Sequence, residues 1–338
     1  MVVKVQRYDK WRERGREWWI LDLEFPIFAS ALTIETSDRM HPIHLIVNPH
    51  SAKGRTGRIA DTVIEWCAAK KLDLIRMDTS GARHATELAC SLDGRARIIA
   101  VLGGDGTLNE VVNGVQGKET ILALLPSGTG NDFAKVLGIA SARAGVEALA
   151  AGRVRLVDLA RVSIDTASGA NIERLFINAV GIGFDAAVAY RVARVRFGRG
   201  MIPYLVGVLA TLRSYRGVQA SIRIGDTVRN TSLFLACFGN GRSSGGGFAL
   251  TPRAEIDDGM LDLCYARDMK VWRVLQVLPK ALSGTHLSAP EVGYERLSTA
   301  EIRLDAPLPV HADGELLTQE ALRVRVSVLP GAQRFIAG

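Results

Sequence analysis

The order of apolar and polar positions changes about half way along the chain. Before Leu156, short apolar runs typical of buried strands alternate with runs of helical spacing. This alternation predicts a parallel sheet with helices on both faces. After Val157, β-rich runs separated by turn signals predict a mostly antiparallel second domain, with a helix over 203–216 lying on it. The expected strands are 44–47, 72–77, 98–102 and 121–125 in the first half, and 156–164, 221–224, 233–238, 261–265, 300–304 and 322–328 in the second.

Two of the buried runs lead into glycine-rich turns. The run 98–102 stops at Gly103-Gly104-Asp105-Gly106, and the run 121–125 is followed by Ser127-Gly128-Thr129-Gly130. Glycine permits a tight turn and lets backbone N–H groups approach an anion closely. Because the carboxyl ends of parallel strands meet at one edge of a sheet, the two turns predict a polyphosphate site and therefore a nucleotide-binding protein.

Each turn is expected to lead into a helix. Thr107 stands at the first helix start with Glu110 as its capping-box partner, and Asn131 opens the second helix. The form of these loops excludes the commoner nucleotide sites. The sequence has no G-x-x-x-x-G-K-[ST] loop, no G-x-G-x-x-G in its first βα unit and no protein-kinase catalytic set.

A third polar loop lies upstream of the two glycine-rich turns. The strand 44–47 ends at Asn48-Pro49, and Ser51, Lys53 and Arg58 follow it. Together, Asn-Pro-x-Ser-x-Lys, Gly-Gly-Asp-Gly-Thr-Leu-Asn-Glu and Gly-Thr-Gly-Asn-Asp-Phe-Ala resemble the diacylglycerol kinase catalytic domain. That superfamily includes bacterial soluble lipid kinases and the sphingosine and ceramide kinases, with NAD kinase and phosphofructokinase as distant relatives. Ala52 departs from the pattern, since many members have glycine there.

The resemblance covers roughly residues 42–335 through further motifs, which begin at Asn178, Asn240, Gly245, Asp257 and Asp313. It implies an α/β fold: a doubly wound parallel sheet of the NAD kinase and diacylglycerol kinase type, a mostly antiparallel β second domain, and an active site in the cleft between them. The implied nucleotide-binding domain covers 40–156 plus about 325–338, and the lipid-substrate domain covers 157–324.

Phosphoryl transfer needs a clamp on the triphosphate, a metal ion that spreads charge and a base for the acceptor hydroxyl. The backbone amides of 103–107 are the expected clamp, and Lys53 and Arg58 would balance the charge of the transferred phosphate. The resemblance implies these nucleotide-binding residues: Asn48, Pro49, His50, Ser51, Ala52, Lys53, Arg58, Thr79, Gly103, Gly104, Asp105, Gly106, Thr107, Leu108, Asn109 and Thr129.

Carboxylates would supply the remaining chemistry. Asp105, Asp132 and Asp158 each follow or end a strand, where they can hold Mg²⁺ directly or through water, and Asp185 belongs to the same substrate and Mg²⁺ network. A helix cap is the alternative role for Asp132, and a structural turn is the alternative for Asp158. The resemblance implies that Glu315, in Asp-Gly-Glu, is the general base, with Asp105 as a second catalytic residue.

The resemblance also implies a second, structural Mg²⁺ loop. Its ligands would be the carboxylate of Asp258 and the backbone carbonyls of Glu255 and Met260, and oxygen ligands with few charges suit Mg²⁺. From spacing alone, the Asp-Asp-Gly stretch at 257–259 is as well explained by a hairpin turn.

The net charge of +7 is unevenly distributed, because residues 186–224 carry seven arginines and no acidic residue. The helix expected there has an apolar face made of Leu205, Val208, Leu209 and Leu212. We expect this surface to rest on anionic lipid headgroups through Arg191, Arg194, Arg196 and Arg199. The alternative is a core-packing helix with solvated arginines beside it. No nucleic-acid partner is expected, since the aromatic interleaving of such surfaces is missing.

The other composition signals concern the compartment. The cysteines are scattered without C-x-x-C spacing and predict a reducing environment without disulfides or zinc. No apolar run is long enough to cross a bilayer and no secretory signal is present, so we expect a cytoplasmic protein that associates reversibly with the membrane surface. The N-terminal extension 1–39 is either an interfacial peptide, anchored by Trp18, Trp19 and Phe25, or sequence ahead of the true translation start; we favour the second.

The sequence therefore predicts a lipid kinase that depends on ATP and Mg²⁺ and most simply converts diacylglycerol to phosphatidic acid. Three alternatives stay open: a kinase of another lipid (sphingoid base, ceramide, monoacylglycerol or phosphatidylglycerol), a soluble NAD kinase-like enzyme, and a non-catalytic lipid-binding regulator on a kinase fold. A homodimer is one option for its assembly.

Overall fold

The computed structural model describes residues 11–13, 16–18, 32–34, 41–115, 119–128, 130–194, 201–243 and 247–338. The chain divides into two units, Met1–Ala31 and Leu32–Gly338. The first unit contains the antiparallel pair β1 (Trp11–Glu13) and β2 (Arg16–Trp18). Most of the expected N-terminal extension thus lies outside the described residues. Everything below concerns the second unit.

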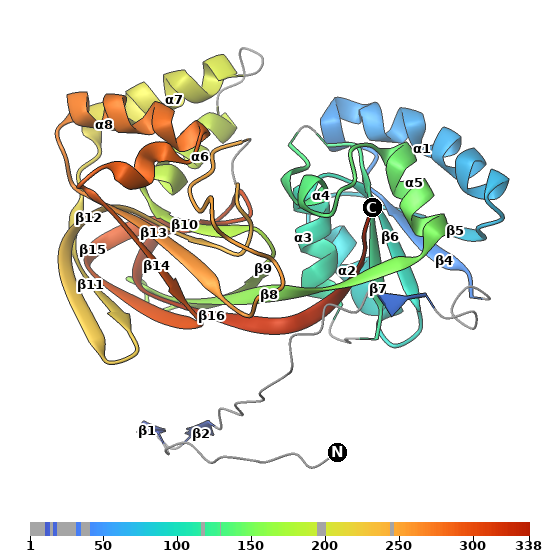
Figure 1. Ribbon diagram of the computed structural model, residues 1–338, viewed down its shortest axis with the longest axis horizontal. Coiled ribbons are helices and arrows are strands. Elements are labelled where there is room, and N and C mark those ends of the chain that lie inside the picture. Colours follow the sequence, from blue (N-terminus) through green and yellow to red (C-terminus); the bar gives the residue numbers. More distant parts are fainter. Residues whose placement is uncertain are drawn as a thin grey trace. The chain divides into compact units, whose positions relative to one another are not determined.

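Four parallel strands form the centre of the first lobe of this unit, the α/β lobe (Figure 1). They lie in the order β5 (Leu74–Asp78), β4 (Ile43–Val47), β6 (Ile98–Gly103) and β7 (Ile121–Pro126). Every residue of β6 and β7 is buried, and for this reason their sequences are continuous apolar runs without alternation.

Five helices cover the parallel strands. They are α1 (Ser51–Ala69), α2 (His84–Leu92), α3 (Asp105–Gly114), α4 (Asp132–Val136) and α5 (Ala142–Ala151). The chain reverses its direction across the sheet after β5, so right-handed crossovers place α1 on one face and α2 with α3 on the other. The α2–α3 contact is tight, because a side chain at Gly114 would come within 2.4 Å of the Thr86 carbonyl oxygen.

The second lobe, the β lobe, is built from antiparallel strands. They are β8 (Arg153–Thr166), β9 (Asn171–Phe176), β10 (Ala179–Gly183), β11 (Val218–Ile224), β12 (Thr227–Gly239), β13 (Leu261–Arg267), β14 (Val292–Leu297), β15 (Thr299–Ala312) and β16 (Glu315–Ile336). Both β12 and β15 pair with β11 along one half and with β10 along the other. The sheet therefore folds over on itself and encloses a second apolar core.

Two long strands, β8 and β16, run through both lobes (Figure 1). β16 pairs with β15 and β8 in the β lobe, and near its end Arg334 and Phe335 pair in parallel with β7. Phe335 is fully buried there and meets Phe133 of α4 edge-on, with ring centroids 5.0 Å apart. The end of the chain thus belongs to the core of the α/β lobe. The short strand β3 (Leu32–Thr33) pairs with the start of β8.

A layer of helices lies on the β lobe. It contains α6 (Phe184–Arg194), α7 (Met201–Ser214) and α8 (Val271–Val277), followed by 3₁₀ turns at Leu278–Leu282 and Thr285–Ser288. Val208 and Leu212 of α7 are buried against α6 and α8, whereas Leu209 is 48% exposed. The expected apolar face of α7 is therefore only partly buried; the side chain of Leu205 lies outside the described residues. Within the part of the chain that the structure describes, no helix has the length and apolar character needed to cross a bilayer.

We expect Phe335→Ala to lower the free energy of unfolding by about 3–5 kcal/mol, because the cavity would open in the core that ties β16 to the α/β lobe. Chemical denaturation would measure the loss. The matched control is Leu156→Ala, at an apolar side chain that is 43% exposed on β8. Equal stabilities of the two variants would contradict this account of the C-terminal strand.

Candidate active site

The two glycine-rich turns contact each other at the carboxyl ends of β6 and β7. Ser127 N donates to the Gly103 carbonyl at 2.9 Å, and Asn131 Nδ2 donates to the Gly128 carbonyl at 2.9 Å. A Cβ atom on Gly128 would lie 2.6 Å from Gly104 Cα, closer than any real contact. Glycine is thus required at this crossing, and the two turns form one surface.

Asp105 holds the second turn by capping α4. Its carboxylate accepts from Asp132 N at 3.0 Å and Phe133 N at 3.2 Å. Burial raises the pKa of Asp105, while these two amides oppose the rise. Asn131 stands at the expected helix start but makes no side-chain capping bond, because Asp105 from the other turn does so instead. Asp132 itself is buried and pairs with Lys135 at 3.1 Å.

The expected capping box at α3 is wrong. Gly104 occupies the N-cap position, where it has no side chain to offer. Glu110 points to α2 and accepts from Ala85 N at 3.2 Å. Thr107 instead accepts from Asn48 Nδ2 at 3.0 Å. A long-range polar contact has replaced the local one that the sequence pattern favours.

The loop after β4 completes the surface. Asn48 bonds Thr107 with its amide nitrogen, and its Oδ1 accepts from His50 N at 3.2 Å. A buried hydrogen bond of 2.8 Å between Thr56 and Ser127 hydroxyls ties α1 to the second turn. Asn48 thereby joins the third loop to the two glycine-rich turns.

The backbone of this loop is left-handed at three successive residues, with φ of 51° at Ala52, 58° at Lys53 and 83° at Gly54. Only glycine adopts this region at no steric cost, so the backbone is strained at Ala52 and at Lys53. The side chains of Lys53 and Arg58 are exposed, and Thr79 is buried at the end of β5. Thr129 lies outside the described residues.

Asp313 links the α/β lobe to the β lobe. Its Oδ2 accepts from Asn109 Nδ2 of α3 at 2.7 Å and from Ile177 N at 2.9 Å. Its Oδ1 accepts from Asn178 N and Ala179 N, both at 2.9 Å. Burial raises the pKa of Asp313, and the four donors oppose the rise. From the sequence, Asp313 was identified only as part of a motif. An aspartate directly before a glycine at a turn could have indicated a structural role, and the φ of Asp313 is indeed 47°.

Glu315 lies two residues beyond Asp313, at the start of β16. Its side chain is 46% exposed, and its carboxylate pairs with Arg174 Nη2 of β9 at 2.8 Å. Asn109 and Asn113 of α3 bond the Leu175 carbonyl next to that arginine. Arg174 was not predicted from the sequence, because nothing local marks an arginine on β9 as a partner of Glu315.

Asp185 lies beside His311 of β15. Its Oδ2 lies 3.2 Å from His311 Nε2, and a side chain at Gly181 would overlap both groups. Gly314 N donates to His311 Nδ1 at 3.4 Å, so Nε2 carries the proton that faces Asp185. Burial lowers the pKa of His311, but the Asp185 carboxylate outweighs it and the net shift is upward. Asp185 therefore supports the turn that carries Glu315.

Asp158 is buried, and its carboxylate joins two loops by hydrogen bonds. Its two oxygens accept from Gly331 N and Gly259 N, both at 2.6 Å. These bonds fix the loop before β13 against a turn in β16. They correspond to the structural alternative for this residue, and among the described residues no hydrogen bond or ion pair joins Asp158 to the glycine-rich turns.

The expected Mg²⁺ loop has a competing cation. Asp258 Oδ1 accepts from Met260 N at 2.9 Å, and its Oδ2 pairs with the guanidinium of Arg296. Burial raises the pKa of Asp258, whereas Arg296 lowers it. No group of three or more His, Cys, Asp or Glu side chains able to hold a metal occurs in the described ranges. Arg296 therefore pairs with one oxygen of the expected side-chain ligand, and the Mg²⁺ site at Glu255, Asp258 and Met260 stays a prediction.

Comparisons with known proteins agree with the arrangement of the loops. Residues 42–162 match the diacylglycerol kinase catalytic domain, and residues 178–337 match the YegS C-terminal NAD kinase beta sandwich-like domain. The chain belongs to the diacylglycerol kinase family. This establishes the family resemblance that the three loops indicated, and with it a catalytic domain of the lipid kinase type.

Individual relatives cover most of this family member. It is 35% identical over 258 residues to the "Probable lipid kinase YegS-like" of Chromohalobacter salexigens, which covers 74% of this chain and 77% of the relative. It is 29% identical over 297 residues to the diacylglycerol kinase of Mycobacterium tuberculosis, and the matched region covers 86% of this chain and 93% of the relative. A solved diacylglycerol kinase structure from Bacillus anthracis has the same fold, with a TM-score of 0.64, 21% identity, and coverage of 88% of this chain and 97% of the other.

Replacing Arg296 by Gln should convert the Asp258 loop into a cation site. Saturating Mg²⁺ is expected to stabilise Arg296→Gln by about 1–3 kcal/mol while leaving the parent unchanged, because binding to the folded state alone raises stability. Thermal unfolding with and without Mg²⁺ measures this. Arg229→Gln, which removes an ion pair of 2.9 Å to the neighbouring Glu295, is the control. If the parent gains as much from Mg²⁺ as the variant, Arg296 does not displace the ion.

Proposed function

We propose that this family member transfers the γ-phosphoryl group of ATP to the hydroxyl of a lipid, with diacylglycerol as the acceptor and phosphatidic acid as the product. The observation that carries the proposal is the meeting of three polar loops at one sheet edge, where Gly104 and Gly128 touch and Asn48 bonds Thr107. Such a surface offers backbone N–H groups and the start of α3 to a polyphosphate.

The roles of the residues follow from their positions. Backbone amides of 103–107 hold the phosphates, and the exposed side chains of Lys53 and Arg58 balance the charge of the transferred group. Mg²⁺ bound together with ATP would neutralise part of the charge of the phosphates. Asp105 acts by capping α4, which fixes the shape of the second turn.

Glu315 is the base in this proposal. The Asp313 carboxylate anchors the β15–β16 turn to α3. Hydrogen bonds therefore fix the position of Glu315 relative to the glycine-rich turns. As the lipid oxygen bonds to the γ-phosphorus, its proton passes to Glu315. The bond from phosphorus to the bridging oxygen breaks, and ADP leaves.

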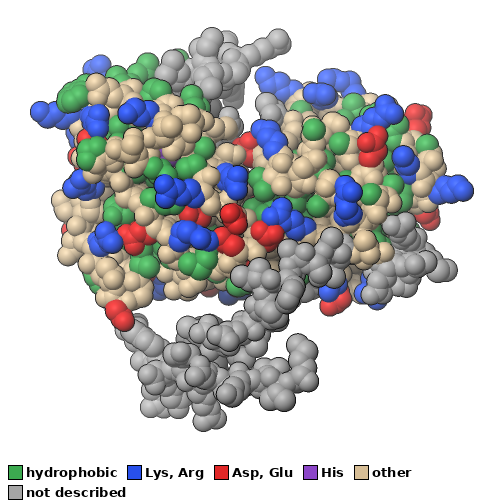
Figure 2. Space-filling model, in the orientation of Figure 1, with side chains coloured by type: hydrophobic (Ala, Val, Ile, Leu, Met, Phe, Trp, Pro, Cys, Tyr) green, Lys and Arg blue, Asp and Glu red, His purple; other side chains and the backbone are tan. Residues whose placement is uncertain are grey.

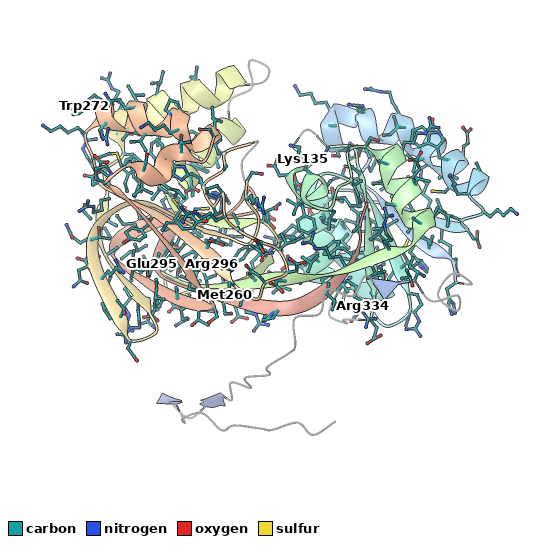
Figure 3. All side chains as sticks on the ribbon, viewed as in Figure 1. Lys135, Met260, Trp272, Glu295, Arg296 and Arg334 are labelled. Atoms are coloured by element: carbon teal, nitrogen blue, oxygen red, sulfur yellow. The ribbon has the colours of Figure 1, made fainter. Side chains whose placement is uncertain are left out.

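The lipid must be taken from a membrane surface, and the helix layer of the β lobe suits that task. Exposed apolar side chains project from α7 (Val206, Leu209), from α8 (Val271, Trp272, Leu275) and from the turn after it (Leu282). Trp272 is 58% exposed and lies on the outer side of α8 (Figure 3). Basic and apolar side chains are mixed over this edge of the lobe (Figure 2), where Lys270 and Lys280 are exposed. We propose that this surface rests on anionic lipid.

Of the four arginines expected to make the membrane contact, the structure describes the side chain of Arg191, which is exposed. Arg191 donates to Ser214 Oγ at 3.0 Å and to the Ala210 carbonyl at 3.4 Å, so it ties α6 to α7. Arg196, Arg199 and the side chain of Arg194 lie outside the described residues. In the proposal, basic residues supply long-range attraction, and the apolar side chains of α7 and α8 supply the contact.

The kinase proposal is tested with purified protein, labelled ATP and a panel of lipid acceptors in mixed micelles, with Glu315→Gln beside the parent. The parent should phosphorylate diacylglycerol in preference to sphingoid base, ceramide, monoacylglycerol and phosphatidylglycerol. Glu315→Gln should still bind ATP but lose about 100-fold or more in turnover, since it cannot accept the proton. Glu320→Gln, at the next glutamate of β16, is the control.

Two results would count against this assignment. A Glu315→Gln rate within about threefold of the parent, less than 1 kcal/mol of barrier, would remove Glu315 from the role of base. No ATP-dependent phosphorylation of any lipid would reject the proposed activity as a whole.

The membrane contact predicts that Trp272→Ser combined with Leu275→Ser lowers binding to anionic vesicles about tenfold or more, because burying such side chains contributes about 1.5–3 kcal/mol each. Vesicle co-sedimentation measures the loss, and the KM for ATP should not change. The control is Ile75→Ser, at an apolar side chain that is 44% exposed on β5. Unchanged vesicle binding by the double variant would show that α8 does not face the membrane.

A further inference from the structure

A pocket of about 630 Å³ lies where the end of α3 meets the strands that run between the lobes. Its walls come from α3 and the residue after it (Asn113, Val115), β8 (Leu159, Arg161), β9 (Glu173, Arg174, Leu175) and β16 (Leu329, Pro330, Ala332, Gln333). The pocket contains none of the residues assigned to nucleotide binding or to the base, yet it includes Arg174, which pairs with Glu315.

The lining of this pocket is divided by chemistry. Leucine, valine, alanine and proline side chains make an apolar wall, whereas Arg161 and Arg174 provide two guanidinium groups. Arg161 is exposed, and among the described residues its guanidinium makes no hydrogen bond or ion pair. Glu173, also exposed, is the one carboxylate in the lining. A ligand with a hydrocarbon part and a strongly anionic head matches both halves.

Arg174 is only partly satisfied where it stands. Its Nη2 pairs with Glu315 at 2.8 Å, but its Nε is buried and has no hydrogen-bond partner. A buried donor without an acceptor costs about 1–3 kcal/mol. An anion in the pocket would offer acceptors that Glu315 does not, so it can compete for this guanidinium.

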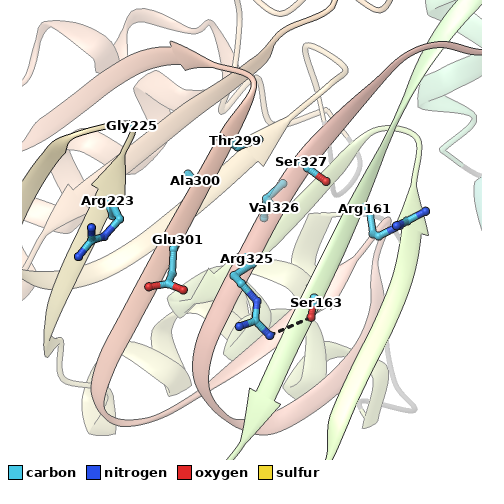
Figure 4. Close-up of a pocket in the computed structure, with 10 residues that line it drawn as sticks. All are labelled: Arg161, Ser163, Arg223, Gly225, Thr299, Ala300, Glu301, Arg325, Val326 and Ser327. Atoms are coloured by element: carbon cyan, nitrogen blue, oxygen red, sulfur yellow. Dashed lines mark hydrogen bonds between the residues drawn. The ribbon is translucent and has the colours of Figure 1, made fainter. Parts of the chain in front are cut away.

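A smaller depression of about 350 Å³ on the neighbouring strands is the rival site (Figure 4). It also has Arg161 at its edge, with Arg223 at the other end and Arg325 between them. There Arg325 already donates to Ser163 and Asp165, and Glu301 stands in the lining. Its lining includes neither Arg174 nor the turn that carries Glu315, so it serves as the control site in the experiments below.

We propose that the larger pocket binds an amphipathic phosphate, a phosphate monoester on a hydrocarbon chain, and that its occupancy draws Arg174 away from Glu315. The released carboxylate is then available to the acceptor hydroxyl, so the ligand activates the enzyme. Arg174 acts as a positioning residue. The activation half of this inference rests on the proposed role of Glu315, whereas the binding half does not.

Binding is tested by titration calorimetry of the full chain with n-octyl phosphate, compared with n-octanol and inorganic phosphate. Octyl phosphate should bind at least about tenfold more tightly than either fragment, because each fragment matches only half of the lining. Arg161→Gln should weaken octyl phosphate about tenfold, and Glu173→Gln should tighten it. Arg223→Gln, which lines only the smaller depression, should bind like the parent.

Activation is tested by turnover at saturating ATP with increasing octyl phosphate. The parent should gain severalfold in kcat, and Arg161→Gln should need about ten times more ligand for the same gain. Unchanged affinity in Arg161→Gln, or equal weakening in Arg223→Gln, would overturn the assignment of the pocket. Binding without any change in turnover would overturn the coupling to Glu315. If the chain phosphorylates no lipid, the proposed function fails, and the calorimetry with its three variants still decides the binding site.

Discussion

The carboxylate of Asp313 is the interaction on which the relation of the two lobes depends. Three successive backbone amides from the turn between β9 and β10 and the side-chain amide of Asn109 converge on its two oxygens. A buried carboxylate is costly unless donors surround it, and here the donors come from both lobes. The arrangement exists only when α3, β10 and the β15–β16 turn are all in place. Glu315 follows in that turn, and its position is a consequence of this one contact.

Other acidic residues of the family motifs serve in the same way. Asp105 accepts hydrogen bonds from two backbone amides at the start of α4, and Asp158 accepts one from each of two turns that are distant in the sequence. Each carboxylate satisfies N–H groups that the ends of helices and strands leave without partners. A motif carboxylate thus can be essential to an active site by shaping its backbone, without touching a substrate.

Local sequence was a poor guide where a polar side chain had a choice of partners. Glu110 lies at capping-box spacing from Thr107, but α2 packs against α3 and brings the amide of Ala85 within its reach. Arg191 lies in a stretch without acids and is exposed as expected, but α7 also offers it a carbonyl and a hydroxyl. Asp258 has the spacing of a metal loop, and the antiparallel neighbour β14 supplies a guanidinium to it that no local pattern announces. In each case the deciding partner is far away in the chain.

The sequence by itself determined the buried strands and the glycine-rich turns that follow them. Continuous apolar runs such as Ile98–Leu102 have one stable environment, a sheet covered on both faces, and Gly104 and Gly128 tolerate a backbone contact that no side chain permits. Tertiary structure alone decided how the charged groups pair. The partners of Asp313, Glu315, Asp185 and Asp258 are separated from them by tens to hundreds of residues. The spacing of charged residues along the sequence does not indicate which residues will pair. Their partners are decided only when packing of the apolar cores brings the strands together.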